Sequence, residues 1–145
     1  MPPSFILPYW SSLPVRSPHP SPRSGAASCL CPSTSPTHLY MFGGYSGTSR
    51  VADLYRYDFR KECWLEVPCL PSTPWPGARE NNGVLICSGT SVYVFGGYNG
   101  SRWLNDLWMF DTLEMRWVCL DPGDDRLEEV RSGRLERSAQ LELLY

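Results

Sequence analysis

Between residues 84 and 120, hydrophobic positions form short runs separated by turn-forming residues, with no helical period. Residues 91–97, SVYVFGG, are an apolar, β-branched and aromatic run ending at two glycines, which is typical of a strand covered on both faces. Further strands are predicted at 84–87 (VLIC), 104–111 (LNDLWMFD) and 116–120 (RWVCL), with a turn at 98–101. This part of the chain therefore predicts four strands.

The same pattern occurs earlier in the chain, because residues 39–64 align without a gap on residues 92–117, 53 positions later. Ten of the 26 aligned positions are identical. They are Tyr40, Phe42, Gly43, Gly44, Tyr45, Gly47, Asp53, Leu54, Asp58 and Trp64, which recur as Tyr93, Phe95, Gly96, Gly97, Tyr98, Gly100, Asp106, Leu107, Asp111 and Trp117. Arg23 and Arg79 precede the two copies at a spacing of 56. Two repeats of one four-stranded unit are predicted.

An Arg-led strand, an aromatic strand ending in Gly-Gly, a Leu-x-Asp-Leu-x-x-x-Asp strand and a late Trp together resemble the kelch repeat. The resemblance covers about residues 23–120. It implies that each repeat is one four-stranded antiparallel blade and that blades pack around a central channel. We therefore predict an all-β, partial kelch β-propeller with one blade at 23–67 and another at 68–120.

The repeated residues have structural roles that follow from their chemistry. Glycine pairs suit backbone positions with positive φ or close approach, aspartates at strand ends accept hydrogen bonds from turn amides, and the two tryptophans bury surface between blades. The two tryptophans are expected at equivalent positions, and their burial need not match. This predicted signature comprises Gly43, Gly44, Asp53, Asp58, Trp64, Gly96, Gly97, Asp106, Asp111 and Trp117.

The two ends of the chain have a different composition. Residues 1–22 are rich in proline and serine and predict a disordered leader, with a proline-rich ligand for an aromatic groove as the alternative. Residues 121–145 are interpreted as an acidic and basic linker followed by the start of a truncated third repeat at Arg134. The alternative there is an amphipathic helix from Leu127 to Leu144, which the pair Glu128 and Arg131 favours and Gly133 disfavours.

Charge and cysteine content narrow the classes of partner. A net charge of −2 gives no general attraction to nucleic acid or anionic lipid, and no apolar run is long enough to span a membrane. The six cysteines include no C-x-x-C pair, and the histidines are His19 and His38, so neither a metal site nor a cofactor is predicted. Cys87 and Cys119 are interpreted as small buried hydrophobes and the other cysteines as free thiols, which favours a reducing, intracellular and cytoplasmic location.

The predicted function is that of a protein-interaction module, a scaffold or adaptor without enzymatic activity. Tyr, Trp and Arg are enriched at binding hot spots, and the loops after the Gly-Gly strands and between the blades contain them. The candidate partner-binding residues are Tyr45, Arg50, Trp75, Arg79, Tyr98, Asn99, Arg102 and Trp103, with Trp103 the strongest. The alternatives are that Trp103 packs against a neighbouring blade and that Arg50 and Arg102 are solvated charges.

Other functions follow only from the family resemblance. One is substrate recognition for a cullin-type ubiquitin ligase, although no BTB or F-box domain is visible in this sequence. Another is a copper oxidase, which needs paired Tyr and His ligands that two histidines outside the repeated strands do not supply. Because propellers close with about four to eight blades, a two-blade chain is also expected to expose blade faces, self-associate or lack a stable fold alone.

Overall fold

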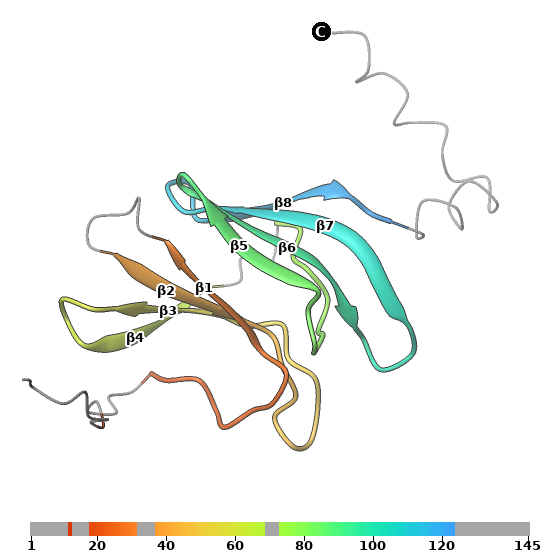
Figure 1. Ribbon diagram of the computed structural model, residues 1–145, viewed down its shortest axis with the longest axis horizontal. Coiled ribbons are helices and arrows are strands. Elements are labelled where there is room, and N and C mark those ends of the chain that lie inside the picture. Colours follow the sequence, from red (N-terminus) through yellow and green to blue (C-terminus); the bar gives the residue numbers. More distant parts are fainter. Residues whose placement is uncertain (1–11, 13–17, 32–36, 69–72, 124–145) are drawn as a thin grey trace, which may run out of the picture.

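A computed structural model of the protein describes residues 12, 18–31, 37–68 and 73–123. Eight strands form two four-stranded antiparallel sheets, each a blade built from consecutive strands (Figure 1). The first blade contains β1 (Ala27–Cys31), β2 (His38–Phe42), β3 (Leu54–Asp58) and β4 (Cys63–Val67). The second contains β5 (Val84–Ser88), β6 (Ser91–Tyr98), β7 (Trp103–Asp111) and β8 (Arg116–Asp121). The predicted all-β architecture of two antiparallel blades is confirmed.

Most of both chain ends lies outside the described residues. This applies to the predicted leader apart from residues 12 and 18–22, and to the linker and third-repeat start apart from residues 121–123. The alternatives for these segments, a proline-rich ligand and a helix from Leu127 to Leu144, also fall there. The proposed repeat boundaries, 23–67 and 68–120, stay predictions.

The glycine pairs lie where backbone segments approach closely, between the two repeats at Gly43 and within the second repeat at Gly96 and Gly97. Gly43 and Gly44 have φ values of 69° and 106°, and a Cβ atom on Gly43 would lie 2.5 Å from the carbonyl oxygen of Arg79 in the second repeat. The Gly44 amide donates to that same oxygen at 2.8 Å. Both glycine pairs therefore allow positive φ and close backbone approach, as predicted, and Gly43 and Gly44 allow that approach between the two repeats.

The core of the molecule is the interface between the two blades. Phe42 packs on Trp117 with ring centroids 5.4 Å apart, and Tyr40 packs on Phe110 at 6.2 Å. The buried cluster draws equally on both sheets, with Cys31, Tyr40, Phe42, Leu54 and Val67 from the first and Leu85, Val92, Val94, Phe110 and Trp117 from the second. Each blade is therefore stabilised chiefly by the apolar surface that its neighbour covers.

The second blade has one covered and one open face, which corrects the expectation that SVYVFGG is covered on both. Val92 and Val94 of β6 face the first blade, whereas Phe95 on the opposite face is 43% exposed. Its counterpart in the first repeat, Phe42, is fully buried. The strand also continues through Gly96 and Gly97 to Tyr98, with a bulge after Phe95, where the sequence predicted an end.

The two repeat tryptophans occupy equivalent positions, as expected. Trp64 lies opposite Tyr57 in the β3–β4 ladder, and Trp117 lies opposite Phe110 in the β7–β8 ladder. Their burial differs, because Trp117 is 1% exposed against the first blade and Trp64 is only partly buried. The difference arises because Trp117 lies between the two blades, whereas no second sheet among the described residues packs on the Trp64 side of the first blade.

The cysteine prediction is wrong for one pair. Cys31 at the end of β1 and Cys87 in β5 form a disulfide that joins the two blades. Cys29, Cys63 and Cys119 are free and partly buried, and burial raises the pKa of the Cys29 thiol to about 11. Cys69 lies outside the described residues. With one cysteine pair oxidised, the cysteines no longer support a reducing compartment.

We expect this disulfide to contribute about 2–4 kcal/mol to stability, because it closes a long loop in the unfolded chain. Reduction with dithiothreitol should lower the melting temperature measured by circular dichroism. The Cys31→Ser/Cys87→Ser variant should melt at the lower temperature with or without reductant. A wild-type melting temperature that reductant leaves unchanged contradicts the prediction.

Candidate partner-binding rim

Each blade has one Arg–Asp ion pair at the end that carries the Gly-Gly pair, and the two ion pairs are equivalent. Arg79 Nη1 and Nη2 donate to the two carboxylate oxygens of Asp106 at 2.7 and 2.8 Å, and Nη1 also donates to the Gly96 carbonyl. Arg23 binds Asp53 and the Gly43 carbonyl in the same way. These side chains therefore fix the loop that follows each Gly-Gly strand.

This arrangement corrects the assignment of Arg79 to a partner-binding surface. Arg79 is 2% exposed, and its Nε also donates to the Gly77 carbonyl at 2.9 Å. A side chain buried with these partners is not presented to another protein. Asp53 and Asp106 lie in the signature positions where the sequence placed them, and the structure adds that they bind the two arginines.

The aspartates at the opposite end close their strands as expected. Asp58 Oδ1 accepts hydrogen bonds from the Arg60 and Lys61 amides, and Asp111 Oδ1 accepts from the Leu113 and Glu114 amides. These amides, first that of Lys61 and first that of Glu114, hold the pKa of each carboxyl below its usual value of 3.8. Both carboxylates therefore serve as turn acceptors.

We define the Gly-Gly rim as residues 45–50, 79–80 and 98–103, which form one end of the two blades. In Figure 1 the β2–β3 and β6–β7 loops lie at the lower edge of the sheets. Arg50 joins the blades there, since its guanidinium lies 5.6 Å from the Tyr45 ring centroid and 4.9 Å from that of Tyr98. It also forms a 2.6 Å ion pair with Glu80. Arg50 is therefore a bridge between loops, and its reading as a solvated charge is wrong.

The outer part of the rim carries an exposed tryptophan, Trp103, which packs on Tyr98. Trp103 is 69% exposed, and its ring lies 5.3 Å from that of Tyr98. Asn99 Oδ1 accepts from the Ser101 and Arg102 amides, which shapes the turn leading to Trp103. Arg102 is exposed. Trp103 therefore packs on its own blade and leaves most of its ring accessible.

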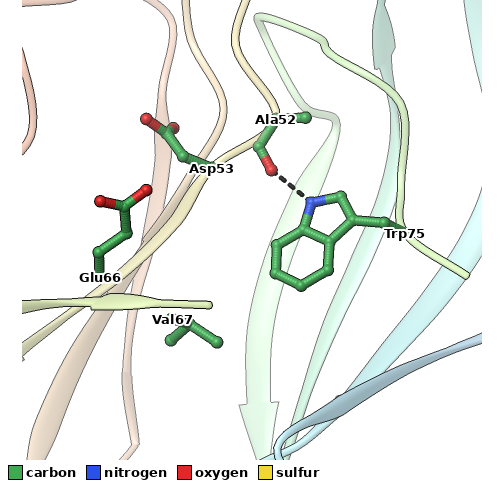
Figure 2. Close-up of a pocket in the computed structure, with 5 residues that line it drawn as sticks. All are labelled: Ala52, Asp53, Glu66, Val67 and Trp75. Carbon is green, nitrogen blue, oxygen red and sulfur yellow. Dashed lines mark hydrogen bonds between the residues drawn. The ribbon is translucent and has the colours of Figure 1, made fainter. Parts of the chain in front are cut away.

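Trp75, in the connector between the blades, lies beside a pocket of about 250 Å³. Its indole Nε1 donates to the Ala52 carbonyl (Figure 2). Its ring centroid lies 5.9 Å from that of Trp117. Asp53, Glu66 and Val67 complete the lining. Trp75 is thus partly buried between the blades rather than projecting from the rim.

Sequence reasoning missed Glu80, the partner of Arg50, and Ala52, the acceptor for Trp75. The residue adjacent to the repeated Arg79 is a carboxylate only in the second repeat, so the repeat pattern did not mark it. Among the described residues, no group of three or more His, Cys, Asp or Glu side chains is arranged to hold a metal ion. No helix within the described ranges is long and apolar enough to cross a membrane.

Comparison with known proteins gives the same repeat architecture as the two four-stranded blades. The family model of the KLHDC2/KLHL20/DRC7 Kelch-repeats domain matches residues 8–136. The chain belongs to the kelch-repeat family. The buried Arg–Asp pairs, Gly-Gly turns and inter-blade tryptophan described above are thus the internal supports of two kelch blades.

Several curated relatives align with this chain. The Rab9 effector protein with kelch motifs of Homo sapiens is 32% identical over 68% of this chain and 26% of its own length. Tip elongation aberrant protein 3 of Schizosaccharomyces pombe is 30% identical over 75% of this chain and 12% of its own. The N-(sulfonatooxy)prop-2-enimidothioate sulfolyase of Thlaspi arvense is 33% identical over 61% and 25%. The kelch chain therefore spans about a quarter or less of these relatives.

Proposed function

We propose that this kelch chain is a protein-interaction module whose Gly-Gly rim contacts a protein partner. The observation that carries the proposal is the exposed Trp103, which rests on Tyr98. An aromatic ring that already packs on a neighbouring ring loses less conformational entropy on binding, and Trp is enriched at binding hot spots. One relative, the human Rab9 effector protein, has a name that refers to a protein partner.

The rim supports a scaffold or adaptor role better than catalysis. Its exposed groups include the Trp103 ring and the Arg102 side chain, which contribute contact area and hydrogen-bond donors, beside the small polar side chains of Thr48, Ser49, Asn99 and Ser101. One relative is named as a sulfolyase, but no residue of this rim pairs a nucleophile with a base. A ubiquitin-ligase adaptor role stays an alternative that only family membership supports.

The test is affinity purification from cells that express the protein, with partners quantified by mass spectrometry. Trp103→Ala is expected to reduce recovery of at least one protein by about tenfold or more, as for a hot-spot residue. Leu113→Ala is the matched control, because Leu113 is 74% exposed at the other end of β7. Equal recovery of every protein by wild type and both variants would overturn the proposal.

A further inference from the structure

The second repeat contains two Asn-Gly pairs, Asn82-Gly83 and Asn99-Gly100. In such a pair the glycine amide nitrogen can attack the side-chain carbonyl carbon of the asparagine, because glycine has no side chain to obstruct the approach and adopts unusual backbone angles at little cost. The attack closes a succinimide ring and releases ammonia, and water then opens the ring to aspartate or isoaspartate. The surroundings of each pair decide whether this reaction proceeds, and they differ between the two pairs.

Asn82-Gly83 is held in a conformation that opposes the reaction. The Gly83 amide, which would be the nucleophile, donates to the Phe95 carbonyl at 3.0 Å. The Asn82 side chain is partly buried, and its Nδ2 donates to the Phe42 carbonyl at 3.2 Å. It also lies against the second glycine pair, since a Cβ atom on Gly97 would stand 2.9 Å from Asn82 Oδ1. Because the nucleophile is engaged and the side chain is enclosed, this pair is protected.

Asn99-Gly100 has a nucleophile that is accessible. Both residues are exposed in the turn between β6 and β7. Within the described residues, the Gly100 amide donates to no acceptor, and Gly100 has a φ of 101°. A Cβ atom on Gly100 would lie 2.7 Å from Arg50 Nη1, so a guanidinium stands beside this part of the backbone. A positive charge there favours the deprotonated amide nitrogen, which is the attacking species.

The side chain of Asn99 is also held with its carbonyl polarised for attack. Its Oδ1 accepts hydrogen bonds from the Ser101 and Arg102 amides, each at 2.9 Å. Negative charge develops on this oxygen when a nucleophile adds to Cγ, and N–H donors already directed at it stabilise that charge. Asn82 Oδ1, in contrast, accepts no hydrogen bond from the described residues. The two amides that shape the turn therefore also favour the addition.

We propose that Asn99 is a site of spontaneous deamidation and that the fold protects Asn82 from the same reaction. The Gly100 nitrogen bonds to Asn99 Cγ and loses its proton through solvent, while the Cγ–Nδ2 bond breaks and Nδ2 leaves, protonated, as ammonia. Water then adds either to Cγ, which gives aspartate, or to the backbone carbonyl carbon of Asn99, which gives isoaspartate. In both products a carboxylate replaces an amide in the turn that leads to Trp103. This chemistry does not depend on the proposed binding role of the rim.

The experiment ages the purified chain at mildly alkaline pH, with and without concentrated urea. Mass spectrometry then quantifies asparagine, aspartate and isoaspartate in chymotryptic peptides, because cleavage after Phe95 separates the two sites. In the folded chain, conversion at Asn99 should be about tenfold or more faster than at Asn82, whose reaction requires the edge of the β5–β6 ladder to open. In urea the two rates should become similar. Equal rates in the folded chain, or an Asn99 that converts only in urea, would overturn the proposal.

Asn99→Ser is the matched control. Ser46 has this position in the first repeat, and its Oγ accepts a hydrogen bond from the Ser49 amide, so the variant keeps an acceptor for the turn but cannot form a succinimide. Labelling with isoaspartyl methyltransferase should show that the variant loses most of the isoaspartate that the folded wild-type chain accumulates. An unchanged yield would place the reaction elsewhere in the chain and overturn the assignment to Asn99.

Discussion

Trp117→Ala is expected to destabilise the chain by about 3–5 kcal/mol, the range for removing a fully buried tryptophan from a core. The indole contacts Phe42 at 5.4 Å, Phe110 at 5.2 Å and Trp75 at 5.9 Å, so its loss opens a cavity in the inter-blade core. Trp64→Ala is the matched change, because Trp64 has the same position in the repeat without a covering blade. It should cost about 1–2 kcal/mol in the monomer.

Denaturant unfolding followed by circular dichroism measures both changes, at concentrations where light scattering reports monomers. A loss of about 3–5 kcal/mol is a large part of the stability of an ordinary domain and is enough to unfold a marginally stable one. Trp117→Phe is the milder variant to measure in that case, because it keeps an aromatic ring in the inter-blade core. The indole N–H that it removes has no hydrogen-bond partner among the described residues. Equal destabilisation by Trp64→Ala and Trp117→Ala would contradict the assignment of the core to the inter-blade interface.

The strands and turns were predictable because their signals are local and occur twice. Apolar runs, Gly-Gly pairs and strand-ending aspartates each act within a few residues, and the offset of 53 placed both copies in register. The end of β6 was misjudged for a local reason. Gly96 and Gly97 were interpreted as a stop, whereas a bulge lets the ladder continue to Tyr98.

Contacts between the blades were harder to predict from the sequence, because they depend on how the two sheets pack. Cys31 and Cys87 are 56 residues apart, the spacing of Arg23 and Arg79, so a signal existed that β1 and β5 are counterparts. That spacing did not show that the two strands meet in space. The number of blades in contact likewise decides whether Phe42 and Phe95 are buried or exposed, although their local sequences are alike.

The candidate rim shows which arginines a repeat pattern marks as structural. Arg79 and Asp106 recur as Arg23 and Asp53, and both pairs bind each other inside their blades. Arg50 and Trp103 occupy the same repeat position with different side chains, and both lie at the rim. An arginine that recurs in both repeats together with an aspartate therefore indicates an ion pair inside each blade. Arg79 was wrongly assigned to the partner-binding surface because this recurrence was not used.

The buried pair of Arg79 and Asp106 leads to the second large effect, since Asp106→Asn removes a charge that balances a buried guanidinium. Breaking one side of a buried ion pair costs about 3–5 kcal/mol, because the remaining charge is uncompensated. Asp106 Oδ2 also accepts from the Trp108 indole N–H at 2.7 Å, so the carboxylate holds two side chains. We therefore expect Asp106→Asn to lower the free energy of unfolding by an amount in that range.

Asp53→Asn is the matched control, because Asp53 binds Arg23 in the same way but has a more exposed side chain, 22% against 11% for Asp106. Water screens the exposed carboxylate more, so its loss should cost less and depend more on salt. The double variant Arg79→Leu/Asp106→Leu should be less destabilising than the sum of its single changes, since it leaves no unpaired charge. Additive losses in this double-mutant cycle, measured by urea unfolding at low and high salt, would show that the two side chains do not stabilise the blade as an ion pair.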